Sequence, residues 1–288
     1  MNDVNPSEPG DPTEIAITGA SGNIGGAVAA TLAASGTPLR LIVRNALKAP
    51  DLPHSAVSVA TYGDREASMK ALSGVETLFM VSAAEDPNRL DQHYDFVDAA
   101  AEAGVRHLVY TSFVGAGPDS TFTLARDHYL TEERIKSTGC AWTILRDSFY
   151  LDFIPSLVGE DGVIRGPAGD GRMAAVARAD VAAVASRVLA DPASHAGRTY
   201  DLTGPRAFSL KEAAKVLSKS TGSTVRFHDE TLEEAYESRQ KWQPEPWQAD
   251  AWVSTYTAIA AGELALVSGD VEAITGRAPQ SLEGLLGV

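Results

Sequence analysis

Three glycines spaced three residues apart give the clearest chemical signal in this sequence. Gly19, Gly22 and Gly25 stand between a short apolar segment, residues 15–17, and an alanine-rich segment. In a strand-to-helix turn, the first glycine permits a sharp reversal, the second clears space for a phosphate, and the third lets the helix pack on the strand. The amides and dipole at the helix N-terminus then attract an anion. The pattern predicts a dinucleotide pyrophosphate site, with a tight turn that binds no ligand as the alternative. The predicted contacts are Thr18, Gly19, Ser21, Gly22, Asn23, Ile24 and Gly25.

The residue after the second apolar segment indicates which dinucleotide would bind. A carboxylate at the end of the second strand accepts hydrogen bonds from the adenosine ribose of NAD. Residues 39–43 are instead followed by Arg44, whose guanidinium can pair with a 2′-phosphate. The sequence therefore favours NADP(H) over NAD(H), with an ordinary solvated charge at Arg44 as the alternative.

Small and polar residues end the next three apolar segments. Asp64 follows the third segment, where it would meet the adenine side of a dinucleotide. The fourth segment ends in Ser82 and Ala83, which would let the nicotinamide ribose approach the backbone, and the fifth ends in Thr111 and Ser112. Ligands of parallel sheets bind beyond the carboxyl ends of the strands. We therefore expect all five residues to contact the cofactor.

Aromatic residues follow the fifth and sixth apolar segments. Phe113, Phe149, Tyr150 and Phe153 are predicted to line a substrate pocket. Phe149 and Phe153 are four residues apart and would share one helical face, a spacing that is also typical of a core. Tyr150 is offset from this face, which would leave its hydroxyl for a ligand.

A second aromatic stretch, residues 242–252, contains three tryptophans and two prolines. The prolines predict a loop or lid. Its tryptophans offer apolar surface to a ligand, a partner subunit or the core of the protein, and Trp247 is the predicted substrate contact.

Apolar and helical patterns alternate through the first half of the chain, which is typical of parallel βαβ units. The patterns predict an α/β fold: a doubly wound, mostly parallel Rossmann sheet with a smaller mixed α/β C-terminal substrate region. A proline-containing loop, residues 49–53, would replace one crossover helix. Strands are expected near 14–18, 39–43, 57–61, 76–81, 107–111 and 141–145, and helices near 23–35, 65–72, 88–103 and 121–138.

The pattern becomes less regular after residue 147. A helix near 180–190 with Asp180 as its cap, a strand near 199–202, and a helix that starts at Ser209 with Glu212 in a capping box are expected. We predict a disordered tail (residues 1–12), a dinucleotide-binding domain (13–147), and a smaller substrate-binding region (148–288) interlocked with it.

Composition narrows the class of protein. The 288 residues include 24 Lys and Arg against 38 Asp and Glu, a net charge of −14 that disfavours a nucleic-acid partner. No apolar run approaches the roughly 20 residues that would cross a membrane. The single cysteine, Cys140, excludes an internal disulfide or a cysteine-cluster metal site, and the six histidines show no metal-ligand spacing. We expect a cytoplasmic monomer or homodimer that binds no metal.

Several segments together resemble the NmrA-like group of atypical short-chain dehydrogenases. They are residues 18–25, 63–64, 110–112, 128–132 and 142–146. Residues 262–265 and 275–282 are similar to the closing signature of the quinone-oxidoreductase branch. The resemblance implies a Rossmann domain, NADP(H) binding and a substrate cleft formed with the C-terminal region.

The usual catalytic pair of short-chain dehydrogenases, Tyr-x-x-x-Lys, is absent after the fifth predicted strand. Tyr129 is followed four residues later by Glu133, which cannot replace the lysine charge. His128 is the predicted proton donor, because an imidazole can protonate a substrate oxygen near neutral pH. Tyr150 and a bound water are the other candidates. For His128 itself, the alternative role is a hydrogen bond to Glu132 or to solvent.

These observations favour an NADPH-dependent oxidoreductase that transfers hydride to a quinone or a related flat conjugated carbonyl compound. A quinone makes weaker demands on an acid catalyst than a ketone does. Two alternatives stay open: a redox-sensing NADP(H)-binding regulator without turnover, and a cofactor-dependent tailoring enzyme, such as an oxygenase, for an aromatic polyphenol.

Overall fold

The computed structural model describes residues 14–288, so the predicted tail, residues 1–12, lies outside the described residues. A seven-stranded sheet dominates the fold, in the order β3-β2-β1-β4-β5-β6-β9. The pairs β1–β2, β2–β3, β1–β4 and β4–β5 are parallel. The strands of this sheet are β1 (Glu14–Thr18), β2 (Leu39–Val43), β3 (Ser55–Val59), β4 (Val75–Met80), β5 (His107–Phe113), β6 (Ala141–Asp147) and β9 (Arg198–Leu202).

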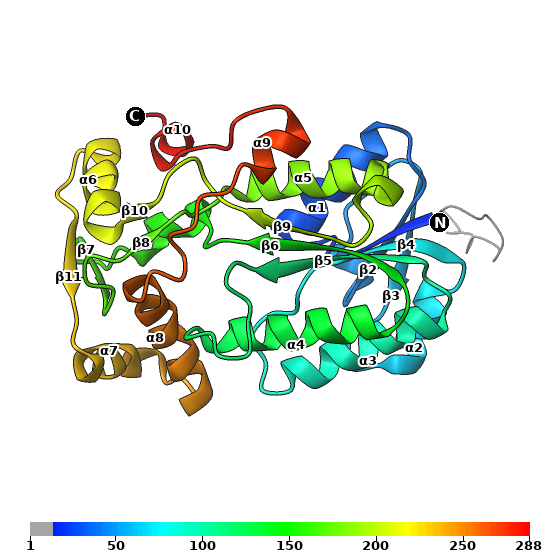
Figure 1. Cartoon of the computed structure of the whole chain (residues 1–288), viewed down its shortest axis with the longest axis horizontal. Coiled ribbons are helices and arrows are strands. Elements are labelled where there is room, and N and C mark those ends of the chain that lie inside the picture. Colours follow the sequence, from blue (N-terminus) through cyan, green and yellow to red (C-terminus); the bar gives the residue numbers. More distant parts are fainter. Residues whose placement is uncertain (1–13) are drawn as a thin grey trace. The chain divides into compact units, whose positions relative to one another are not determined.

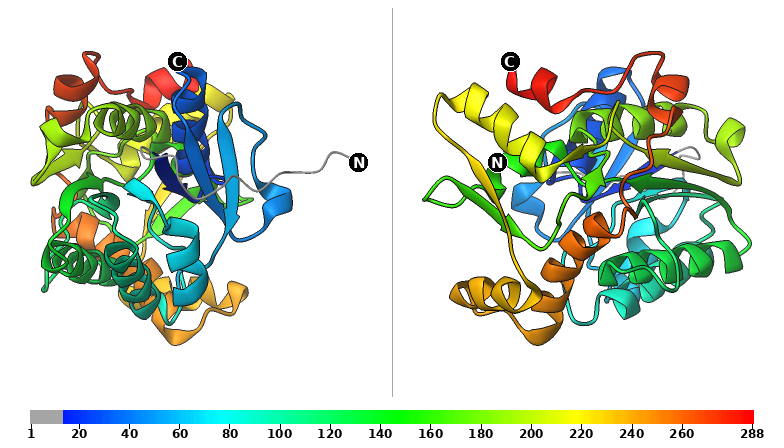
Figure 2. Two further views of the ribbon diagram at one scale, coloured as in Figure 1. Left: turned by 90° about the vertical axis from the view of Figure 1, so that its right-hand side faces the viewer. Right: turned by 60° about the vertical axis from the view of Figure 1, so that its left-hand side comes forward.

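Helices cover both faces of this sheet, as the doubly wound prediction requires (Figures 1 and 2). One face carries α1 (Asn23–Ala34) and α5 (Arg178–Ala190), and the other carries α2 (Arg65–Leu72), α3 (Arg89–Glu102) and α4 (Thr123–Ser137). Because both faces are covered, the central strands are largely apolar, and Leu78, Phe79 and Met80 are fully buried. The predicted α/β Rossmann fold is confirmed.

The predicted strands and helices of the first half all form, with small shifts at their ends. The third strand lies at Ser55–Val59 rather than 57–61, because it pairs with β2 from Leu39 opposite Ser55 to Val43 opposite Val59. A short 3-10 helix, η1 (Ala46–Lys48), precedes the predicted loop at 49–53.

The described chain divides into two compact units, each made of three segments. The first contains residues 14–111, 130–145 and 182–199, and the second contains 112–129, 146–181 and 200–288. The unit boundaries fall inside β5, α4, β6, α5 and β9.

The second unit adds two small strand pairs and a set of helices. Strand β8 (Arg172–Met173) is antiparallel to β10 (Phe208–Ser209), and β7 (Val163–Gly166) is parallel to β11 (Arg226–Asp229). Figure 1 labels all four strands. Leu151, Met173, Phe208 and Ile259 belong to its buried core. The remaining helices of the second unit are η2 (Leu151–Leu157), α6 (Leu210–Thr221), α7 (Leu232–Arg239), η4 (Gln240–Trp242), α8 (Pro246–Ala260), α9 (Asp270–Thr275) and α10 (Leu282–Leu286). The short helix η3 (Pro192–His195) belongs to the first unit.

Three local predictions in this unit have different outcomes. The capping box of Ser209 and Glu212 is present at the start of α6. The predicted loop at 242–252 is wrong in its second half, because Pro246 occupies the first turn of α8, where a missing N–H costs nothing. Asp180 does not cap α5, which begins two residues earlier at Arg178.

Asp180 instead connects α5 to the C-terminal segment. Its fully buried carboxylate accepts a hydrogen bond from the Gln280 N–H at 2.7 Å and pairs with the Arg277 guanidinium at 2.8 Å. Both partners belong to the 275–282 motif, so this motif has a structural role in the second unit.

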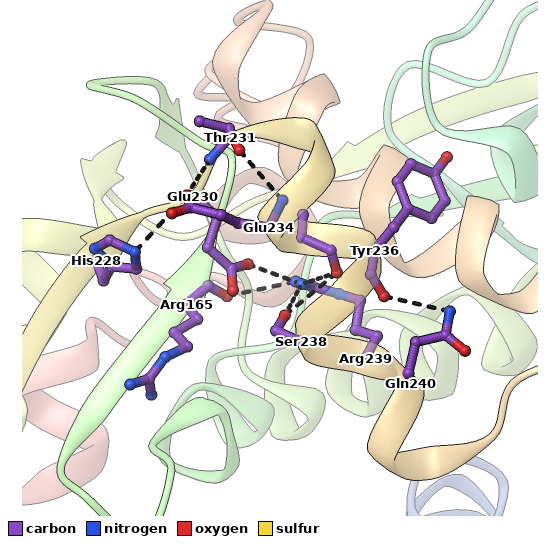
Figure 3. A network of polar contacts seen from close by, with 10 residues as sticks. Arg165, His228, Glu230, Thr231, Glu234, Tyr236, Ser238, Arg239 and Gln240 are labelled. Atoms are coloured by element: carbon purple, nitrogen blue, oxygen red, sulfur yellow. Dashed lines mark hydrogen bonds and ion pairs between the residues drawn. The ribbon is translucent and has the colours of Figure 1, made fainter.

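A buried ion pair joins α7 to the β7–β11 region of the second unit (Figure 3). Arg239 Nη1 contacts Glu230 Oε2 at 2.8 Å, and both side chains are almost entirely buried. Arg239 also donates to the Ala235 carbonyl and to Ser238 Oγ, at 2.8 and 3.0 Å. Its guanidinium lies 5.0 Å from the ring centroid of Tyr256. The charge of Arg239 is therefore compensated on several sides.

Candidate functional site

The glycine turn has the geometry that the sequence predicts. Gly19 has a φ of +62°, and its carbonyl accepts a hydrogen bond from the Gly22 N–H at 2.8 Å. A Cβ atom on Gly25 would lie 2.4 Å from the Gly19 oxygen, so only glycine allows α1 to approach the end of β1 so closely.

The N-terminus of α1 is also suited to an anion. Its N-cap is Gly22, no side chain of the described residues caps it, and its first turn has no acidic residue. By contrast, Asp64, Ser209, Thr231 and Ser281 cap other helices with their own oxygens. Exposed Ser21, Gly22 and Asn23 surround this end. These residues fit a dinucleotide pyrophosphate, because unopposed helix amides and a Cβ-free approach are what it requires.

Thr18 faces the protein interior and fixes the turn to the neighbouring strand. Its buried hydroxyl accepts a hydrogen bond from the Val81 N–H at 2.9 Å and lies 2.5 Å from the Tyr62 hydroxyl. Tyr62 in turn donates to the Val81 carbonyl at 2.5 Å, and burial raises the pKa of its phenol. Tyr62 positions the backbone beside the glycine turn, a role that the sequence analysis missed. Its position one residue before the Gly63-Asp64 motif was the available signal.

Two predicted adenosine-side contacts, Arg44 and Asp64, follow β2 and β3. Arg44 is exposed immediately after β2. The Asp64 carboxylate accepts a hydrogen bond from the Ala67 N–H at 3.0 Å and so caps α2. Its contact with the adenine side stays a prediction alongside this capping role.

The 82–83 segment after β4 is held by three side chains. Thr111 Oγ1 accepts a hydrogen bond from the Ser82 N–H at 2.8 Å, and His93 Nε2 accepts one from the Ala83 N–H at 2.9 Å. Arg89 Nε donates to the Ala83 carbonyl at 3.1 Å. The predicted residues Ser82, Ala83 and Thr111 therefore lie together at the carboxyl edge of β4 and β5.

His93 was not predicted from the sequence, although it lies on the buried face of α3. Its Nδ1 is 2.9 Å from the Thr131 hydroxyl. Burial and the nearby Arg89 charge lower its pKa well below the ordinary value, so the ring is neutral and Nδ1 carries the proton. A neutral ring is the form that can accept the Ala83 N–H.

The predicted proton donor His128 lies in an aromatic cluster of the second unit. Its buried ring stacks on Phe113, with ring centroids 6.2 Å apart, and Phe113 meets Phe122 edge to face at 4.9 Å. Ser112, the preceding residue of β5, is buried. The structure thus brings His128 and Phe113 together, as a shared pocket role requires.

Phe149 and Phe153 also meet, with ring centroids 5.8 Å apart. Phe149 precedes the 3-10 helix η2 and packs against the core, whereas Phe153 is 45% exposed. Trp247 is half-buried in the first turn of α8. Trp242 and Trp252, rather than Trp247, form the close tryptophan pair, 6.3 Å apart.

Tyr150 has a partner that the sequence analysis missed. Its hydroxyl donates to Asp147 Oδ2 at 2.8 Å, and Asp147 is only 1% exposed. Burial raises the pKa of the Asp147 carboxyl to about 8 and that of the Tyr150 phenol well above its ordinary value. The signal in the sequence was a carboxylate at the end of an apolar strand, three residues before a tyrosine.

Residues 14–288 contain no cluster of His, Cys, Asp and Glu that could hold a metal ion. None of the helices in this range is long and apolar enough to cross a membrane.

Comparison with known proteins matches a family described as NAD(P)H-binding to residues 19–192, more than half of the chain. The chain belongs to this family. The match begins at Gly19, in the turn where the sequence predicts the pyrophosphate. The matched residues include the glycine turn, the 82–83 segment and His128. The family resemblance that the sequence motifs predict is confirmed.

Two relatives of this NAD(P)H-binding chain have names that state a reaction. Quinone oxidoreductase 2 of Escherichia coli is 39% identical over 223 residues, which cover 75% of this chain and 77% of the relative. The NAD(P)H azoreductase of Xenophilus azovorans is 31% identical over 268 residues, covering 91% of this chain and 93% of the relative. The crystal structure of an NADPH-dependent quinone oxidoreductase from E. coli, complexed with NADPH, has a TM-score of 0.86 at 33% identity, over 95% of this chain and 98% of that one.

Proposed function

We propose that this protein is an NADPH-dependent oxidoreductase that reduces quinones or related flat conjugated carbonyl compounds. The observation that carries the proposal is the uncapped, glycine-lined N-terminus of α1, in a chain 39% identical to a quinone oxidoreductase. Bound NADPH supplies the hydride.

Within the protein, the turn at residues 18–25 holds the pyrophosphate and Arg44 pairs with the 2′-phosphate. The 82–83 segment, positioned by His93 and Thr111, contacts the nicotinamide ribose. The N–H groups of both residues in this segment are already hydrogen-bonded, so the segment would lose little conformational entropy when the cofactor binds. This pre-organisation favours a single orientation of the nicotinamide.

Aromatic residues and two proton-bearing groups act on the substrate. Phe113, Phe149, Phe153 and Trp247 provide apolar surface for a flat ring. His128 and Tyr150 are the candidate donors of a hydrogen bond or a proton to the substrate oxygen. The proposal includes a cytoplasmic location and a monomeric or homodimeric state.

The experiment is oxidation of NADPH by the purified protein with a panel of quinones. Loss of the reduced-nicotinamide absorbance should require both protein and quinone, and NADH should be a poorer donor. An azo dye tests whether the acceptor range extends to the chemistry named for the second relative. Tight NADPH binding without turnover of any acceptor would contradict the proposal and favour a regulator.

The Tyr150→Phe and His128→Gln variants separate the two candidate donors. Tyr150→Phe removes the phenol hydroxyl, and His128→Gln replaces the titratable imidazole with an amide that cannot act as an acid, each with nearly unchanged side-chain volume. Loss of the true proton donor should lower kcat by about 100-fold. Equal activity of both variants and the wild-type protein would mean that solvent supplies the proton.

A further inference from the structure

We propose that Asp147 stores the proton which Tyr150 delivers to the reduced substrate, so that Asp147 and Tyr150 act as a relay. Tyr150 would be the catalytic residue, and Asp147 the positioning residue that acts through it. This inference rests on the proposed quinone reduction and deepens it, because it assigns the source of the proton.

The geometry of the two side chains supports a relay. Asp147 is the last residue of β6, and Tyr150 follows three residues later, with its hydroxyl 2.8 Å from Oδ2. The other carboxyl oxygen, Oδ1, is buried without a hydrogen-bond partner among residues 14–288. A carboxylate with only one partner in a buried position is poorly stabilised, which favours the protonated form.

The pair lies beside the predicted substrate residues of the second unit. The Val114 N–H donates to the Asp147 carbonyl at 3.0 Å, which places the end of β6 against the residue that follows Phe113. On the other side, Phe149 and Leu151 form backbone hydrogen bonds with Val176, at 2.8 and 2.9 Å. The backbone on both sides of Tyr150 is therefore fixed.

The charged groups around the relay are few. The Arg178 guanidinium lies over the Tyr150 ring, 5.1 Å from its centroid, and Asp152 is the other charge acting on Tyr150. The exposed Asp152 carboxylate accepts a hydrogen bond from the Arg178 N–H at 2.9 Å. No cation is in direct contact with Asp147 among the described residues, so burial dominates and raises its pKa to about 8.

Without Asp147, proton donation by Tyr150 would leave a buried tyrosinate. Burial is the largest cause that raises the pKa of the Tyr150 phenol well above the ordinary value, so leaving a tyrosinate behind would be costly. When Asp147 is protonated, it can donate to the Tyr150 oxygen and free the Tyr150 proton to point toward a substrate.

The proton count balances with one relay turnover. Reduction of a quinone to a hydroquinone consumes one hydride, which carries both electrons, and one proton. The substrate oxygen forms its new O–H bond with the Tyr150 proton as the Asp147 proton passes to Tyr150. Asp147 is left as a carboxylate and regains a proton from water after the product leaves.

The first test is the protonation state of Asp147 in the cofactor-free protein. Infrared difference spectra should show a protonated carboxyl band that disappears as the pH rises through about 8, and the band should be absent from Asp147→Asn. Absence of the band from the wild-type protein at pH 6 would overturn the proposal.

The second test is the pH profile of quinone reduction. Wild-type kcat should fall above pH about 8, where Asp147 loses its proton. Asp147→Asn keeps an acceptor for the Tyr150 hydroxyl but stores no proton, so kcat should drop about 10- to 100-fold and lose this limb, with KM for NADPH unchanged. Tyr150→Phe should show the same drop in kcat and the same loss of the alkaline limb.

Asp152→Asn is the matched control, because it removes a carboxylate charge near Tyr150 without touching the stored proton. It should retain the alkaline fall in kcat.

If Asp147→Asn keeps the wild-type pH profile, the relay is wrong even though the enzyme is active. If no acceptor oxidises NADPH while the carboxyl band still titrates, the proposed function fails and the proton store stands.

Discussion

At the scale of single residues, the functional side chains differ in how strongly their surroundings hold them. Thr18, Tyr62 and His93 are fixed by two or more hydrogen bonds each and position the backbone around the predicted cofactor. Arg44 is exposed and available to a ligand. The proposed cofactor preference therefore depends on an exposed residue, which can be substituted without loss of the fold.

Arg44→Ala should test this choice. Removing a charge-assisted contact with the 2′-phosphate should weaken NADPH binding by about 1.5–3 kcal/mol, or roughly 10- to 150-fold, and leave NADH binding nearly unchanged. Tryptophan fluorescence titrations with both cofactors measure the difference. Equal weakening of both would show that Arg44 does not contact the 2′-phosphate.

At the scale of elements, a buried ion pair makes the stability of helix α7 depend on one side chain. Helix α7 ends with Arg239, whose guanidinium compensates the buried Glu230 carboxylate (Figure 3). Without its partner, Glu230 would stay buried and charged, or would have to take up a proton. By contrast, Arg165 pairs with Asp161 at 2.6 Å on the surface, where water screens both charges.

Arg239→Ala should therefore destabilise the protein by about 3–5 kcal/mol in urea unfolding. The exposed control Arg165→Ala should leave the unfolding midpoint nearly unchanged. Combining Arg239→Met with Glu230→Leu should recover most of the loss, since no charge then remains buried. Equal effects of Arg239→Ala and Arg165→Ala would show that the Glu230 pair contributes no more than a surface pair.

At the scale of the whole molecule, the relay should affect folding stability. The folded pKa of Asp147, about 8, lies above the ordinary value of 3.8. Between these values the folded protein binds the proton and the unfolded chain does not, so the free energy of unfolding falls as the pH rises. Above pH 8 the full cost, at most about 6 kcal/mol, is present.

Asp147→Asn removes this titration. Relative to the wild-type protein, its Tm should rise between pH 5 and pH 8, with each kcal/mol worth about 2–4 °C. The change with pH is the readout, because the amide also alters local hydrogen bonding by a constant amount. A Tm difference that is the same at both pH values would contradict the raised pKa.

The sequence by itself determined the Rossmann fold, the glycine turn and the family. Alternating patterns, and a turn that only Gly19 and Gly25 allow, are local and therefore readable in order along the chain. Tertiary structure decided that His93 holds the Ala83 amide, ten residues away, and that Arg239 balances Glu230. It also decided the state of Asp147, because a carboxyl group keeps its proton only where surrounding strands and helices exclude water, and burial is a property of the folded chain.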